Sequence, residues 1–267
     1  MSSAAPRTTF AVLFFVCGVV SIAVPTISWG QDLDPRRWDH LPIDLNVAGT
    51  ALVYTDGKIS FDPVLQIEDA VMARRTYAFK YLRSFELLGK SARLELLQTY
   101  VDVEWSGLLA GAPASAIRKG WGDTEARFAV NLIGAPQLTR AVFSLYRANL
   151  ENETIVGAGL VVQFPTGEYL EDKLLNIGTN RYIFRPQLGI LHRHRKLSID
   201  ITFSSWLYTD NNEFIINNKL EQDPLHVLQA HGVYSLAPAC GLAPGSVTAT
   251  AKRRRSTAYR ATIAKKS

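Results

Sequence analysis

Hydrophobic residues recur at every second position along most of this chain, in segments of about ten residues separated by Gly, Asp, Asn and Pro. The plainest case is the segment 196–208, which reads KLSIDITFSSWLY. Because neighbouring side chains of a strand point to opposite faces, each such segment has one apolar and one polar face. No stretch of about 18 apolar residues follows Gln31, so the pattern predicts antiparallel β-structure without a membrane-spanning helix in that part. Eight strands are expected, at 45–55, 70–86, 91–105, 122–133, 153–165, 180–193, 195–209 and 224–236.

Two parts of this pattern are irregular. The third expected strand changes phase near residues 97–100, which predicts a β-bulge because one extra residue moves the following side chains to the other face. The connection 134–152 is irregular, and we assign it to no element. Short turns at 88–91 and 192–196 alternate along the chain with longer connections at 56–69, 106–120, 166–180 and 209–224.

Two architectures have such strands. A soluble sandwich or lipocalin-like barrel turns the apolar faces inward, whereas an outer-membrane barrel turns them toward lipid and lines its interior with polar groups. Alternating short and long loops are typical of the membrane barrel, as are aromatic residues near strand ends. The aromatic residues concerned are Tyr77, Tyr81, Phe85, Tyr182, Phe184, Trp206 and Tyr208. The pattern therefore favours an antiparallel transmembrane β-barrel, and the soluble barrel stays open as the alternative.

The N-terminal residues 1–30 read as a secretory signal peptide. Arg7 precedes the apolar run 10–24, and small residues lie before a cleavage point after Gly30. A transmembrane anchor is the alternative, but 15 residues are fewer than the roughly 20 that a helical span needs. We therefore expect residues 31–237 to form the barrel domain.

Charge distinguishes a third part of the chain, residues 238–267, from the expected barrel domain. The formal net charge is +5, yet residues 31–237 carry 21 Lys and Arg against all 24 Asp and Glu. The basic excess lies in residues 238–267, which hold seven basic residues and no acid. The charge therefore does not indicate nucleic-acid binding by the barrel domain. The tail is either a basic non-barrel segment or the product of a reading-frame shift near residues 236–240, which would leave the barrel truncated at its C-terminus.

Six short motifs resemble a known family. They are the segments 67–70 (IEDA), 81–93 (YLRSFELLGKSAR), 120–123 (GWGD), 131–136 (NLIGAP), 172–181 (DKLLNIGTNR) and 221–225 (EQDPL). Together they resemble the bacterial outer-membrane proteins grouped as the "MetA-pathway of phenol degradation" transporter family, over about residues 40–237. The resemblance implies a β-barrel in the outer membrane of a Gram-negative bacterium, linked by name to uptake of aromatic or other hydrophobic compounds. It carries no catalytic residues.

Charged residues on the polar strand faces are the candidates for the interior of the barrel. They are Lys80, Arg93, Glu95, Glu125, Arg127, Arg181, Arg185, Asp200 and His231. Since both signs are present, an internal ion-pair network is expected, and a pore lining that selects solutes by charge is the alternative. In the long connection 166–180, the residues Asp172, Lys173, Asn176 and Asn180 are candidates for a constriction of the interior, with a packed loop cap as the alternative.

These features predict a channel or transporter for small hydrophobic or aromatic compounds, exported by a cleaved signal peptide. A structural barrel with a filled interior and a soluble periplasmic barrel that binds a lipidic ligand are the other hypotheses. The expected partners are outer-membrane lipid, a small hydrophobic or aromatic solute, and the export and barrel-assembly machinery, without nucleic acid. No metal site, cofactor or enzymatic activity is expected, because His192 and His194 flank a basic turn and the common catalytic motifs are missing from the sequence.

Overall fold

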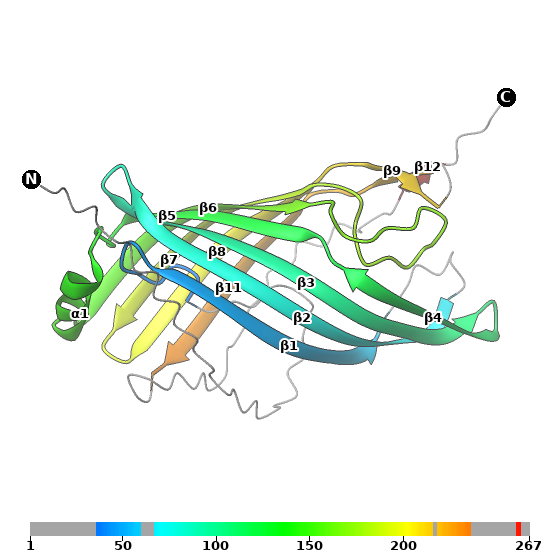
Figure 1. Ribbon diagram of the computed structural model, residues 1–267, viewed down its shortest axis with the longest axis horizontal. Coiled ribbons are helices and arrows are strands. Elements are labelled where there is room, and N and C mark those ends of the chain that lie inside the picture. Colours follow the sequence, from blue (N-terminus) through cyan, green and yellow to red (C-terminus); the bar gives the residue numbers. More distant parts are fainter. Residues whose placement is uncertain (1–35, 60–66, 216–217, 236–259, 263–267) are drawn as a thin grey trace, which may run out of the picture.

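The computed structural model describes residues 36–59, 67–215, 218–235 and 260–262. Most of them form long antiparallel strands (Figure 1). The strands of the main sheet are β1 (Asn46–Lys58), β2 (Ile67–Leu87), β3 (Lys90–Leu109), β4 (Ala112–Trp121), β5 (Thr124–Ile133), β6 (Asn152–Phe164), β7 (Ile183–His194), β8 (Leu197–Tyr208) and β11 (Leu225–Tyr234). The other elements are the helix α1 (Arg140–Ala148) and the short strands β9 (Asn211–Phe214), β10 (Asn218–Glu221) and β12 (Arg260–Thr262).

The main sheet is a curled meander with the order β1-β2-β3-β5-β6-β7-β8-β11, and β4 pairs with β3 beside this path. The eight strands of the path correspond to the eight that the sequence predicts. Among the described residues, β1 pairs only with β2, and β11 pairs only with β8, so the described sheet is curled but open. One end carries the turn between β2 and β3, the turn between β7 and β8, and α1; we call it the short-turn end (Figure 1). The loop 166–180 and the turn between β3 and β4 lie at the other, long-loop end (Figure 1).

The facing of the strands distinguishes the two architectures. In β8, Ile199, Ile201 and Phe203 are 44, 45 and 47% exposed, whereas the alternating residues Asp200 and Thr202 are each 2% exposed. The polar face is therefore buried on the concave side, and the apolar face lies on the outside. A soluble barrel requires the opposite facing, while this one matches a barrel surrounded by lipid. The antiparallel membrane-barrel fold predicted from the sequence is confirmed.

The outer apolar band has the height of a membrane core. At roughly 3.4 Å per residue and a tilt of roughly 40°, the stretch of β8 from Leu197 to Leu207 rises about 26 Å, close to the ~25 Å band of such barrels. On the side of the long loops, Tyr77, Tyr100 and Trp121 are aligned across β2, β3 and β4. Their ring centroids are 6.4 and 5.4 Å apart. This aromatic row lies where an interfacial girdle is expected.

The predicted bulge near residues 97–100 is wrong. The register between β2 and β3 runs without a break from Val71↔Ser106 to Leu87↔Lys90, and its one shift lies between Glu68 and Val71. What changes near residue 98 is the second neighbour of β3, on the side away from β2. This neighbour is β5 up to Leu97 and β4 from Tyr100 onward. Beyond this point the hairpin of β3 and β4 extends past the aromatic row. Val101 and Val103 then face inward while Asp102 and Glu104 face outward, so the polarity of the two faces exchanges although the backbone does not bulge.

The remaining regions complete the comparison with the sequence. The long connection expected at 106–120 is instead the end of β3 and the strand β4. The unassigned connection 134–152 contains α1, and the connection 209–224 contains β9 and β10, which form a small sheet with β12. The predicted signal peptide and the proposed frame shift near 236–240 lie outside the described residues. No helix in the described ranges is long and apolar enough to cross a membrane.

Candidate functional site in the interior of the sheet

The N-terminal segment, residues 36–44, crosses the concave side of the sheet near the short-turn end. Its Trp38 is completely buried and packs in a cluster with Ala129, Ala135, Ile155 and Leu191. The segment therefore occupies the interior that the curled strands enclose.

Two glycines make room for the indole ring. Gly157 and Gly189 lie directly opposite each other on β6 and β7. A Cβ added at either position would overlap the ring of Trp38. A glycine inside a strand is usually unfavourable, but it permits this close approach of a bulky side chain to the backbone. We call this pair the glycine notch.

Polar groups fix the orientation of the same ring. The indole Nε1–H donates a hydrogen bond to Thr202 Oγ1 at 2.8 Å. The guanidinium of Arg127 lies 5.2 Å from the ring centroid, within the range of a cation–π interaction. Arg127 also donates to the carbonyl of Arg37 at 3.5 Å. Trp38 is thus held by packing, by a hydrogen bond and by a cation.

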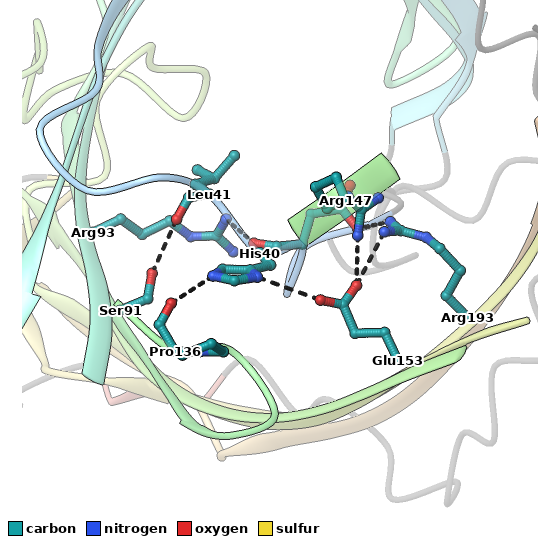
Figure 2. Close-up of polar contacts among 9 residues, drawn as sticks. His40, Leu41, Ser91, Arg93, Pro136, Arg147, Glu153 and Arg193 are labelled. Atoms are coloured by element: carbon teal, nitrogen blue, oxygen red, sulfur yellow. Dashed lines mark hydrogen bonds and ion pairs between the residues drawn. The ribbon is translucent and has the colours of Figure 1, made fainter. Parts of the chain in front are cut away.

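A second set of contacts holds His40 at the short-turn end (Figure 2). Its Nε2 donates to the carbonyl of Pro136 at 2.7 Å, and its Nδ1 lies 3.4 Å from Glu153 Oε1. Phe143 and Tyr146 of α1 contact the imidazole edge-on, at centroid distances of 4.9 and 5.5 Å. The helix therefore covers the end of the interior at which the N-terminal segment is bound.

Charged side chains anchor the segment beside His40. Arg193 bridges two carboxylates, because its Nη2 lies 2.7 Å from Asp39 Oδ1 and its Nη1 lies 3.1 Å from Glu153 Oε2. Nη1 of Arg147, on α1, lies 2.7 Å from the same oxygen of Glu153. Arg93 Nη1 donates to the carbonyl of Asp39 at 3.4 Å. Burial raises the pKa of the Asp39 carboxyl above its ordinary value, and the neighbouring Arg193 opposes this rise.

Four of the nine predicted interior residues meet in one network. Glu95 accepts from Arg127 at 2.5 Å and lies 2.8 Å from Lys80 and 3.2 Å from Arg93. Arg127 additionally donates to Gln187 at 3.2 Å. Three cations therefore converge on one carboxylate, and we call these four residues the Glu95 network.

The other five predicted residues also belong to the concave face but form separate contacts. Arg185 lies 3.6 Å from Glu125 and 5.0 Å from the ring of Trp206. Arg181 lies 4.6 Å from the ring of Tyr208 and donates to Gln222. Asp200 accepts from Thr202 at 2.8 Å and is paired in register with His231 on β11. Whether any of the nine lines a solute path stays a prediction.

The four candidate loop residues are placed at the long-loop end. Asp172 and Lys173 pair with each other at 2.6 Å, with both side chains about half exposed. Asn176 bonds the backbone of Leu170 and Lys173 within its own turn. Asn180 donates to Asn211 and Glu213. These contacts hold the loop on itself and on its neighbour, and a constricting role stays a prediction.

Asp123 attaches that loop to the rim of the sheet, a role that sequence reasoning missed. Its carboxylate accepts from Gln163 at 2.8 Å, from Gly167 N at 2.8 Å, and from Thr179 N and Oγ1 at 2.9 and 2.7 Å. The residue belongs to the motif 120–123 (GWGD), which contributes to the sequence prediction only as part of the family resemblance. The binding of Trp38 and His40 was also missed, although a tryptophan in a polar segment was an available signal.

Within the described ranges, no group of three or more His, Cys, Asp or Glu side chains could hold a metal ion. The described interior presents ion pairs, amides and the buried indole of Trp38.

Comparison with known proteins agrees with this architecture. The structure is similar to a crystal structure of an outer membrane channel from Pseudomonas putida F1, with 22% sequence identity and a TM-score of 0.56. The alignment covers 78% of this chain and 72% of that one. No curated protein sequence matches the chain. The family described as "Putative MetA-pathway of phenol degradation" matches residues 69–250, which is more than half of the 267 residues. The chain belongs to this family.

Proposed function

We propose that the protein is an outer-membrane channel that admits small hydrophobic or aromatic compounds. The observation that carries the proposal is the facing of the strands, with apolar side chains outside and paired charges inside. A sheet of this kind is stable only when lipid surrounds it and water or polar groups fill it. The similarity to an outer membrane channel and the membership of a family named for phenol degradation support the same function.

The interior supports a narrow path. The N-terminal segment and the Glu95 network both lie on the concave side, where Trp38, Arg93, Glu95 and Arg127 are buried. A wide, water-filled pore would leave such side chains exposed. Small solutes therefore fit the proposal better than large ones do.

The location follows from the same fold. We propose export by a cleaved signal peptide in residues 1–30, assembly by the barrel-assembly machinery, and residence in the outer membrane of a Gram-negative bacterium. The proposal includes neither an enzymatic activity nor a nucleic-acid partner.

Ion conductance across planar bilayers tests the channel. The full chain should give discrete single-channel steps of small size. Trp38→Ala should enlarge them, because the N-terminal segment loses its buried anchor. Trp121→Ala is the matched control, since this tryptophan lies in the aromatic row on the outer face and should leave the steps unchanged. Absence of steps in both the wild type and Trp38→Ala would refute the channel.

A structural barrel with a filled interior is the second candidate. It is favoured by the number of contacts that hold the N-terminal segment, among them the Arg193–Asp39 pair and the Trp38–Thr202 hydrogen bond. This hypothesis predicts a chain that fractionates with the outer membrane yet conducts nothing, even when the segment is released. The conductance experiment therefore decides between the two.

A further inference from the structure

A pocket lies at the long-loop end, between the hairpin of β3 and β4 and the loop 166–180. Its floor is the concave face of the hairpin, with Trp105, Gly107 and Ala116, and Leu174 and Leu175 of the loop cover it. Ile67 and Ala70 close one side. The register shift of β2 lies between Glu68 and Val71 and includes Asp69, which has a φ of 47°. A bulge of this kind re-aims the neighbouring side chains, and here it leaves Ile67 and Ala70 at the pocket.

The size of the pocket limits its ligand. Its volume is about 260 Å³, whereas a cavity of about 150 Å³ lined by aliphatic side chains and Phe holds one benzene molecule. Larger, drug-sized ligands occupy about 300–1,000 Å³. The pocket therefore takes one six-membered ring with a small substituent. Trp105 provides an aromatic surface, and the leucines provide an apolar cover.

The charges of the pocket indicate the nature of that substituent. Among the described residues, those that line the pocket include Arg118 and Lys173 and no acid. Lys173 is paired with the exposed Asp172 at 2.6 Å. In Arg118, Nη1 donates to the carbonyl of Ile117, while the buried Nε has no hydrogen-bond partner among the described residues. A buried donor without an acceptor is unfavourable, and a carboxylate is the acceptor whose geometry best fits a guanidinium.

We propose that this pocket is an entry site for monocyclic aromatic carboxylates, with the ring beside Trp105 and the carboxylate on Arg118. The inference rests on the proposed channel function and gives it a substrate class. A neutral ring would fill the apolar part but would leave Nε of Arg118 without a partner. An aliphatic acid would satisfy Arg118 but would make less contact with the indole.

Calorimetric titration of the full chain in phosphatidylcholine nanodiscs tests the site, with benzoate and benzamide as the two probes. Both probes have the same ring, and only benzoate carries a charge. The wild type should bind benzoate at least tenfold more tightly than benzamide. Equal binding of the two, or no binding of benzoate, would overturn the proposal without any variant.

Variants then locate the site. Arg118→Gln should weaken benzoate binding at least tenfold, and Ala116→Leu should weaken the binding of both probes, because it fills the pocket. Lys119→Gln is the matched control: it removes the same charge one residue further along β4, where the side chain pairs with Asp102 at 3.0 Å on the other face. Affinity unchanged in Arg118→Gln, or lost equally in Lys119→Gln, would contradict the assignment.

The proposed binding site and the proposed channel function can be refuted separately. Benzoate binding without single-channel conductance would refute the transport function and leave the site in place. Conductance without benzoate binding would refute the site and leave the channel in place. Heat-modifiable migration in gels shows which variants have folded, and the comparison of benzoate with benzamide in the wild type holds even when Arg118→Gln does not fold.

Discussion

The glycine notch makes a prediction that a single methyl group can test. In Gly189→Ala the added Cβ would overlap the indole of Trp38, so the ring must leave its place. Trp38 then loses its complete burial, its hydrogen bond to Thr202 and its contact with Arg127. Truncation of a buried tryptophan costs about 3–5 kcal/mol, and every 1.4 kcal/mol is a factor of ten. The docking equilibrium of the N-terminal segment should therefore shift by roughly two to three and a half orders of magnitude.

Two measurements report on this release. Trypsin should cut after Arg36 and Arg37 faster in Gly189→Ala than in the wild type, and the single-channel steps should become larger. Gly232→Ala is the matched control, because nothing lies within 4 Å of a Cβ at that position of β11. The control should behave like the wild type in both assays.

A double variant provides the decisive comparison. Once Trp38→Ala has removed the ring, the methyl group of Gly189→Ala no longer meets it, so the second substitution should add nothing to the first. Equal effects of Gly189→Ala in the presence and absence of Trp38 would refute the notch, since residues in contact must show an interaction energy. Unchanged trypsin cleavage in the single variant Gly189→Ala would refute it as well.

Three further substitutions test other parts of the structure. In Glu95→Gln, Lys80, Arg93 and Arg127 lose the carboxylate on which they converge. The free energy of unfolding should therefore fall by about 3–5 kcal/mol, and the reversal potential should shift toward selectivity for anions. Glu104→Gln, on the outer face, should change neither quantity. Asp123→Ala removes three hydrogen bonds that hold the loop 166–180, and cleavage at Lys173 should become faster while heat-modifiable migration is retained; an unchanged cleavage rate would contradict this role. Ile201→Lys places a charge in the outer apolar band and should cost about 2–4 kcal/mol in urea unfolding from lipid vesicles, whereas a cost below about 0.5 kcal/mol would contradict the lipid-facing assignment.

Much of the fold could be predicted because its signal is local. The alternation in β8 is a property of consecutive residues, and it locates a strand without knowledge of its neighbours. The predicted bulge near residues 97–100 failed for the opposite reason. The polarity of the two faces of β3 depends on whether lipid or water surrounds them, and it exchanges where the strand passes the aromatic row at Tyr100. A change of surroundings and a change of backbone register produce the same pattern in the sequence.

The interior could be predicted only as a set of residues. Glu95 and Arg127 were both expected on the polar faces, but their contact depends on the register of β3 against β5, which makes them direct partners. A shift by one residue would send one of the two side chains to the outer face. The register follows from the turns and from the lipid-facing rows of both strands together, and neither strand contains it alone.

The glycine notch is the feature least accessible from sequence, because its cause lies far along the chain. In the sequence, Gly157 and Gly189 resemble residues that weaken a strand, and nothing near them explains a missing side chain. The explanation is Trp38, which fills the space that the two side chains would occupy. The glycine notch of β6 and β7 and the N-terminal segment therefore form one unit. A barrel that never held the segment would have no reason to lack side chains at this pair of positions. For this reason the N-terminal segment belongs to the interior of the folded protein, and any solute path must pass beside it or displace it.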